Sequence, residues 1–294
     1  MNAPRLFQLD RAAVKRSFAR ASRSYDASAG LQRAIQQELL ERLQFFNITP
    51  ADILDLGAGT GATSVELRRR YRRARIIALD MAFEMLQVAG HRQWPWRRFS
   101  RLCAEASALP LADHSVDLVV SNLMLQWCDR PVLVFAELQR VLKPGGLLLF
   151  STFGPATLQE LREAWSGADA QAHVSDFPDM PMLSAAIQQA GLTEPVLDIE
   201  RRVIHYAQPA ALMRELRALG ARNAHVERAR GLTGRRRFDV MRSMYERGRV
   251  AAGLPATYEV IYGAAFASDR HRQDQGDETL VPLQSLRTRQ RASP

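Results

Sequence analysis

The residues best suited to chemistry lie in segment 52–61, which reads D-I-L-D-L-G-A-G-T-G. An apolar run carries the acid Asp55 and then breaks, a pattern that predicts a buried strand, a tight turn and the start of a helix. Glycine suits that turn because it adopts backbone angles that a side chain forbids and lets a ligand approach the main chain closely. We therefore expect a nucleotide-like ligand at the carboxyl ends of parallel strands, held by a loop that contains Gly57, Ala58, Gly59 and Gly61.

Two acids narrow the choice of nucleotide. A dinucleotide fingerprint would place its third glycine where this chain has Ala62, and Asp55 would repel a pyrophosphate but attract a cationic amino-acid end. Asp80 ends the next apolar strand and suits a ribose diol. This pattern resembles the class I S-adenosylmethionine-dependent methyltransferases. A nicotinamide cofactor, or a glycine turn with no ligand, is the alternative interpretation.

The elements that must position these residues alternate along the chain. We expect strands over 75–80, 99–103, 116–121 and 147–153, and helices over 61–72, 82–90 and 131–142. Such alternation predicts an α/β fold with a doubly wound, mostly parallel, seven-stranded Rossmann-like sheet. Apolar residues at helical spacing predict two amphipathic helices ahead of the glycine strand, with a break near Tyr25.

We divide the chain into three parts. Residues 1–46 form N-terminal capping helices, 47–267 form the class I methyltransferase domain, and 268–294 are expected to be a disordered, polar and arginine-rich tail. A long basic helical insertion over about 208–253 precedes the last strand, at 257–266. Such an insertion either covers the sheet edge where ligands bind or is an ordinary helical decoration.

Composition adds an expected location and partner. The chain has 294 residues, 47% of them hydrophobic. Its apolar runs fall short of the ~18 residues that a membrane span needs. Its first ten residues lack the apolar core of a signal peptide, so we expect a cytoplasmic protein. The net charge of +9 comes almost entirely from arginine and favours an acidic partner, nucleic acid or protein, unless it is only biased composition. The histidines and cysteines lack metal-ligand spacing, so no metal is assigned, and Cys103 and Cys128 are expected to be core thiols.

Three further stretches strengthen the resemblance to S-adenosylmethionine-dependent methyltransferases. In that class, an acid after the third strand bonds the adenine amino group and the next N–H meets the ring, which implies Glu105 and Ala106 here, with glutamate where aspartate is usual. Segment 113–122 resembles the strand that carries the methyl-transfer end, and segment 142–146 resembles the turn before the fifth strand. The implied cofactor is S-adenosylmethionine, contacted also by Met81 and Asn122.

Outside this common core the chain resembles the malonyl-acyl carrier protein O-methyltransferases of biotin synthesis. The matching stretches are F-A-R-A-S-R-S-Y-D (18–26), S-N-L-M-L-Q-W (121–127), 149–162, 212–223 and 256–263. The resemblance implies methyl transfer to the free carboxylate of a malonyl thioester on acyl carrier protein, an acidic partner. That carboxylate is ionised at neutral pH and already nucleophilic, so we assign no catalytic side chain beyond positioning and removal of water.

The resemblance also suggests substrate residues. Tyr25 would close over the methyl donor, and Gln126 and Trp127 would line the substrate side. Arg214 and Arg217 are the candidates for holding the substrate carboxylate by the planar guanidinium fork, because Asp176 stands where the family commonly carries arginine. Arginines along 214–249 would steer docking of acyl carrier protein: Arg217, Arg222, Arg228, Arg230, Arg235, Arg236 and Arg237.

Two alternatives stay open at this level. The first is a methyltransferase for another small molecule or for RNA, although a basic stripe interleaved with aromatics is missing, so nucleic acid is not the expected partner. The second is an assembly factor of respiratory complex I with a methyltransferase fold, which segment 151–162 also resembles. The intact glycine loop and the 18–26 segment favour the enzyme.

Overall fold

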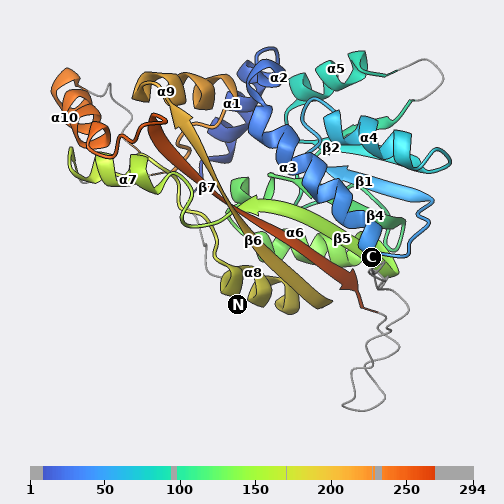
Figure 1. The fold of residues 1–294 in the computed structure, drawn as a ribbon. Helices are drawn as coiled ribbons and strands as arrows, with labels where there is room; N and C mark the ends of the chain where they lie inside the picture. The colour runs from blue at the N-terminus through green and yellow to red at the C-terminus, as the bar shows by residue number, and fades with distance from the viewer. Residues whose placement is uncertain (1–8, 94–97, 170, 227, 229–233, 269–294) are drawn as a thin grey trace, which may run out of the picture.

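A computed structural model describes residues 9–93, 98–169, 171–226, 228 and 234–268 (Figure 1). Apart from Ser268, the predicted tail lies outside the described residues. A seven-stranded sheet runs through the molecule in the order β3-β2-β1-β4-β5-β7-β6. Its strands are β1 (Asp52–Leu56), β2 (Arg75–Asp80), β3 (Ser100–Cys103), β4 (Val116–Asn122), β5 (Leu142–Phe153), β6 (Leu192–Tyr206) and β7 (Leu254–Ala267).

Strands β1 to β5 pair in parallel, and β7 runs antiparallel to both β5 and β6. The predicted fold class is therefore confirmed. The helices are α1 (Arg11–Ala21), α2 (Tyr25–Ser28), α3 (Gly30–Glu41), α4 (Ala62–Arg70), α5 (Phe83–His91), α6 (Pro131–Val141), α7 (Gln159–Ser166), α8 (Met180–Gln189), α9 (Pro209–Ala218) and α10 (Arg235–Glu246), with 3₁₀ turns at Arg42–Phe45 and Leu125–Trp127.

The sheet is covered on both faces because successive strand residues point to opposite sides. In β1, Ile53 belongs to the core cluster that includes Ile35 of α3 and Leu67 of α4. The next residue, Leu54, belongs to the second cluster, with Phe135 of α6. Strands that are buried on both faces read as continuous apolar runs, which is why the sequence pattern identified them.

The structure adds detail to the expected elements. Among the described residues, the predicted basic helical insertion holds two helices, α9 and α10, with residues 219–234 between them. Strand β5 begins at Leu142, because Leu142 already pairs with Val116 of β4; the K-P-G-G segment follows at a register shift, and pairing resumes between Leu147 and Leu118. Helix α7 was not predicted, and it packs against α10 at the end of the molecule away from β1 (Figure 1).

Candidate functional site

A cavity opens where β1, β2, β3 and β4 end. About 880 Å³ of space here is free of protein atoms, a volume that includes the part open to solvent. Because parallel strands end at one edge of the sheet, loops far apart in the sequence supply its walls. Among the lining residues are Leu56, Gly57, Gly59, Asp80, Met81, Ala104, Glu105, Ala106, Asn122 and Leu123, together with Arg11, Phe18 and Tyr25 from the N-terminal helices.

The glycine loop is held against β2 and presents bare main chain to the cavity. The N–H groups of Gly57 and Ala58 donate to the carbonyl of Leu79 at 2.8 and 2.9 Å. Gly57 has a φ of +75°, which L side chains rarely adopt, and a Cβ at this position would collide with the side chain of Met124. The close approach that the sequence predicted therefore has a physical reason at Gly57.

Asp80 lines the cavity at the end of β2, as the sequence predicted. Its two carboxylate oxygens accept the N–H groups of Gly59 (2.9 Å) and Ala82 (2.8 Å). Burial raises the pKa of this carboxyl, although those two hydrogen bonds favour the charged form. The carboxylate is thus held in one orientation, with lone pairs left to accept hydrogen bonds from a ligand.

Asp55, predicted to contact the ligand, does not line the cavity. It is 1% exposed, and its Oδ2 accepts the hydroxyl of Ser64, on the first turns of α4, at 2.5 Å. The reason is the two-residue period of the strand: Asp55 shares a face with Ile53, and α4 packs on that face. Burial raises its pKa to about 7, and its hydrogen bond to Ser64 ties β1 to α4, the helix that follows the glycine loop.

Glu105 and Ala106 follow β3 and line the cavity beside Met81, so the structure brings the three predicted residues together. Glu105 is half exposed and pairs with Arg11 of α1 at 3.1 Å. Cys103, predicted to be a core thiol, is exposed. Cys128 lines the cavity, and burial raises the pKa of its thiol to about 12, so it is not a nucleophile at neutral pH.

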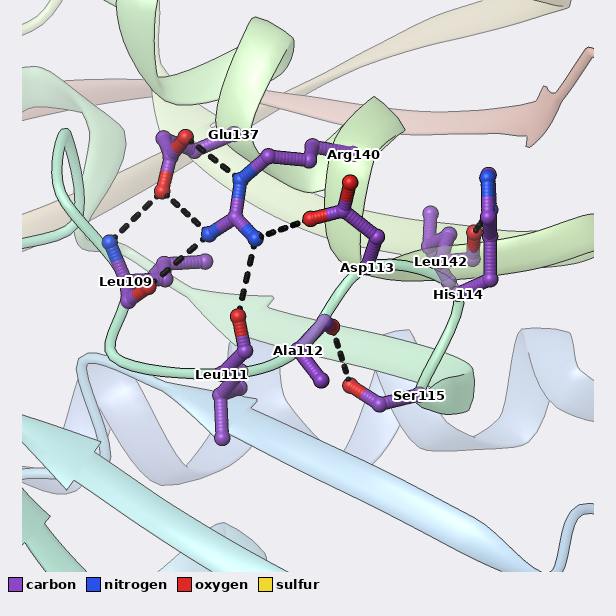
Figure 2. A network of polar contacts seen from close by, with 9 residues as sticks. All are labelled: Leu109, Leu111, Ala112, Asp113, His114, Ser115, Glu137, Arg140 and Leu142. Carbon is purple, nitrogen blue, oxygen red and sulfur yellow. Dashed lines mark hydrogen bonds and ion pairs between the residues drawn. The ribbon is translucent and has the colours of Figure 1, made fainter.

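The loop between β3 and β4 is anchored to α6 by one arginine. Figure 2 shows the guanidinium of Arg140 pointing into this loop, where it donates to the carbonyls of Leu109 and Leu111, both at 2.8 Å. It also pairs with Asp113 at 2.6 Å and with Glu137 at 2.8 Å. Glu137 in turn accepts the N–H of Leu109 at 2.7 Å. These contacts lower the pKa of Glu137 and fix the loop that continues from Glu105.

The 18–26 and 121–127 segments meet at the other side of the cavity. Tyr25, Asn122 and Trp127 all line it, and the ring of Phe18 meets Trp127 edge to face at a centroid distance of 5.2 Å. Burial, together with the nearby carboxylates of Asp80 and Asp26, raises the pKa of Tyr25, so its hydroxyl stays protonated. Asn122 is fixed by the hydroxyl of Ser151, which donates to its side-chain oxygen at 2.8 Å.

Gln126, Arg214 and Arg217, the other predicted substrate contacts, do not line this cavity. Gln126 is buried and donates to the carbonyl of Leu123 at 2.8 Å, so it shapes the loop after β4. Arg214 and Arg217 are exposed on α9, which lies beside α2 (Figure 1). Asp176 is exposed as well, so its reversed charge faces solvent.

The comparisons with known proteins agree with this geometry. A family model described as "Methyltransferase domain" matches residues 54–150. The chain is 44% identical to a malonyl-[acyl-carrier protein] O-methyltransferase of Xylella fastidiosa (strain M23), over 95% of this chain and 97% of that protein. It is 42% identical to the protein of the same name from Laribacter hongkongensis (strain HLHK9), over 93% and 96%. The chain belongs to the malonyl-[acyl-carrier protein] O-methyltransferase family.

Solved structures show the fold of this methyltransferase at lower sequence identity. The crystal structure of the YcgJ protein from Bacillus subtilis superposes with a TM-score of 0.58 at 16% identity, covering 81% of this chain and 99% of that one. Among the described residues, none of the helices combines the length and apolarity that crossing a bilayer requires.

Sequence reasoning missed several residues that line the methyltransferase's cavity. Arg11 is the clearest case, and the chain carried a signal for it: Arg11, Phe18 and Tyr25 recur every seven residues. Seven residues are close to two helical turns, so the first two share one face of α1. Met124, Asp129 and Arg130 also line the cavity, but they lie in loops whose direction the sequence pattern does not specify.

Proposed function

We propose that this chain transfers a methyl group from S-adenosylmethionine to the free carboxylate of malonyl-acyl carrier protein, which gives the malonyl methyl ester at an early step of biotin synthesis. The observation that carries the proposal is the cavity itself, whose walls combine the glycine loop, Asp80 and the N-terminal helices. Similarity over nearly the whole length of two malonyl-[acyl-carrier protein] O-methyltransferases supports the choice of substrate.

The groups around the cavity fit S-adenosylmethionine. A side chain at position 57 would collide with Met124. The glycine loop therefore has no side chain at this position, and a ligand would contact its main chain. We assign the ribose diol to the Asp80 carboxylate, and the adenine to Glu105 and the N–H of Ala106, with Met81 against the base. The methionine end would lie along the bare loop and Asn122.

The substrate needs little help from acid–base groups. A carboxyl group titrates near ~4, so the malonyl carboxylate is ionised at neutral pH and already nucleophilic. The protein's task is to place one carboxylate oxygen in line with the methyl group that S-adenosylmethionine supplies, which can lower a barrier by ~7 kcal/mol or more. Tyr25 and Trp127 would close this end of the cavity against water, and exclusion of water removes stabilising hydration from the carboxylate.

We assign the cation that receives the substrate carboxylate to Arg130, in place of Arg214 and Arg217. Arg130 lines the cavity and forms no ion pair with the part of the chain that the structure describes. By contrast, Arg11, which also lines the cavity, is paired with Glu105 and Asp129. A planar guanidinium with free donors can hold a carboxylate through two hydrogen bonds.

We place docking of the acidic acyl carrier protein on the exposed arginines of α9, α10 and the segment between them. Arg228 is excluded because it is partly buried and paired with Asp10 at 3.0 Å, and Arg237 lies 3.5 Å from Asp169. Arg230 lies outside the described residues. Exposed arginines without an ion pair among the described residues remain, namely Arg217, Arg222, Arg235 and Arg236. Such charges steer encounter with an oppositely charged partner.

The decisive test is incubation of the purified protein with isotopically labelled S-adenosylmethionine and malonyl-acyl carrier protein, followed by mass spectrometry. We expect the malonyl group to gain one methyl. Acetyl-carrier protein, which has no free carboxylate, should gain none, and succinyl-carrier protein tests whether chain length is read. Donor binding without transfer to malonyl would show that the acceptor is a different molecule.

A further inference from the structure

Helix α1 is tied to the rest of the molecule on both sides of the cavity. At its start, the N–H of Asp10 donates to the carbonyl of Ala224 at 2.8 Å, and the Asp10 carboxylate pairs with Arg228 at 3.0 Å. Toward its end, Phe18 packs on Trp127 with ring centroids 5.2 Å apart. Since α1 also contributes lining residues, it forms a wall of the cavity that is held at both ends.

Between these anchors, Arg11 joins two loops that are distant in the sequence. Its Nη1 lies 3.1 Å from Glu105 Oε2, in the loop after β3. Its Nη2 lies 2.6 Å from Asp129 Oδ1, before α6, and Nε donates to the same oxygen at 3.1 Å. Asp129 has a side chain only 12% exposed. The hydrogen bond to Asp129 raises the pKa of Arg11, so its guanidinium is charged at every ordinary pH.

The bridge occupies only one oxygen of Glu105. The other, Oε1, accepts no hydrogen bond within the part of the chain that the structure describes. A carboxylate oxygen accepts hydrogen bonds and donates none, so it suits a ligand group that carries hydrogen. Beside it, Leu79, Met81 and Val134 give the cavity an apolar wall, which suits the flat face of a base.

We propose that Arg11 is a positioning residue for the donor site: it holds Glu105 through one oxygen and aims the other at the 6-amino group of the purine. This makes the site selective for a 6-aminopurine. The proposal rests on the proposed function, because it takes the ligand to be S-adenosylmethionine. The Glu105 side chain is 55% exposed and would otherwise sample several rotamers. The guanidinium fork, anchored on Asp129, restricts it.

The test compares two ligands by titration calorimetry: S-adenosylhomocysteine and its 6-deamino analogue, whose purine lacks only the amino group. Wild-type protein should prefer S-adenosylhomocysteine by about tenfold, the effect of one hydrogen bond to a charged group. In Arg11→Met the preference should fall to about twofold or less. Arg11→Lys, which keeps the charge but not the fork, should give an intermediate ratio. Arg20→Met is the matched control, since Arg20 is an exposed arginine of α1 that does not line the cavity.

The ratio of the two affinities separates positioning from a structural role. If Arg11→Met weakens both ligands equally and keeps the wild-type ratio, Arg11 only holds the wall in place and the proposal is wrong. An unchanged ratio with unchanged affinities also overturns it. Should Arg11→Met fail to fold in a thermal melt, Arg11→Gln takes its place with the same expected ratio. If wild-type protein binds neither ligand, the proposed function itself fails, which is a distinct outcome.

Discussion

Two regions of the molecule differ in how they place their polar side chains: the edge of the sheet that lines the cavity, and the helical insertion before β7. At the edge, β1 to β4 end together, so their loops line one cavity, and several side chains there are fixed by hydrogen bonds. In the insertion, α9 and α10 are separate helices (Figure 1), and of their exposed arginines Arg237 and Arg242 form ion pairs with described residues. Parallel topology determines where strand ends meet, whereas helix packing determines where a helical side chain points.

The largest expected effect tests the cavity edge at Gly57. Gly57→Ala should weaken S-adenosylhomocysteine binding by ~1,000-fold or more, because a Cβ at this positive-φ position collides with Met124 in the cavity wall. Gly145→Ala is the matched control, with a similar φ of +73° but nothing within 4 Å of the added Cβ. Both variants should lose about 1–2 kcal/mol of stability from the left-handed backbone. Equal affinities of the two variants would contradict the role of this loop.

The second prediction concerns Asp55, which is buried at the end of β1 before the glycine loop and accepts a hydrogen bond from Ser64 of α4. Burial raises its pKa to about 7 from the 3.8 that is ordinary for aspartate, so the stability that neutral Asp55 provides is complete below about pH 4 and is lost as pH rises through about 7. Asp55→Asn cannot ionise, so its free energy of unfolding should rise relative to wild type across this window, by up to about 4 kcal/mol.

Urea denaturation from pH 4 to 8 measures this difference between Asp55→Asn and wild type. The exposed Asp239, paired within its own helix, provides the control: Asp239→Asn should show a difference that does not vary with pH. Affinity for S-adenosylhomocysteine should change by less than about threefold in Asp55→Asn. If Asp55→Asn instead loses much of its affinity for S-adenosylhomocysteine and shows no pH-dependent change in stability, Asp55 contacts the ligand, as the sequence suggested.

The third prediction tests the anchor of the loop between β3 and β4. Arg140→Met leaves Glu137 and two loop carbonyls without their donor (Figure 2), and should cost about 2–3 kcal/mol in the free energy of unfolding. Donor affinity should fall with it, since the same loop continues from Glu105. Arg69→Met, which breaks an exposed pair with Glu66, should cost less than about 1 kcal/mol. If thermal melts show equal losses of stability in Arg140→Met and Arg69→Met, the Arg140 network contributes no more to stability than an exposed ion pair does.

The fourth prediction compares an arginine of the cavity with one of the insertion. Arg130→Met should raise KM for malonyl-coenzyme A, a malonyl thioester without the acidic carrier protein, by about 10–100-fold, the loss of a charged hydrogen-bonded pair. Arg217→Met should leave that KM unchanged, because Arg217 is exposed on α9 and does not line the cavity. The affinity for S-adenosylhomocysteine, measured in both variants, separates substrate from donor binding. The reverse pattern of KM values would restore the assignment made from sequence.

The smallest expected effect belongs to the insertion surface. Arg235→Glu with Arg236→Glu should raise KM for malonyl-acyl carrier protein by about fivefold, and less at high salt. KM for malonyl-coenzyme A, the same chemistry without the acidic protein, should stay unchanged. Arg72→Glu with Arg73→Glu reverses two exposed charges after α4 and serves as the control. If both double variants raise KM for malonyl-acyl carrier protein equally, docking depends only on the net charge of the protein and not on this surface.

Much of the cavity edge was predictable because a local rule applied to each piece. The apolar runs of β1, β2 and β4 identified those strands, and the predicted residues at or just after strand ends, Gly57, Asp80, Glu105 and Asn122, all line the cavity. They come together because parallel strands end at a common edge whatever their side chains do. Helix α7 escaped prediction, since its short sequence lies between the end of β5 and a segment without clear periodicity.

Predictions that needed the direction of a single side chain were less accurate. Asp55 precedes Gly57 by two residues, yet the alternation of β1 turns it toward Ser64 and away from the cavity. Gln126 and Trp127 are neighbours, but only Trp127 lines the cavity. Motif resemblance places a residue in a segment, and the rotation of that segment depends on what packs against it.

By itself, the sequence determined the α/β architecture, the glycine loop and the family, because these depend on local apolar periods and on residue types at fixed spacing. Only the tertiary structure decided which charges meet. Arg11, Glu105 and Asp129 lie in three separate segments and come within ion-pair distance because α1 crosses the cavity. The sequence made Arg214 and Arg217 of α9 equally good candidates for binding the substrate carboxylate. In the fold, α9 packs beside α2 and both side chains are exposed to solvent. Long-range contacts of this kind depend on the packing of whole elements, which no local pattern records.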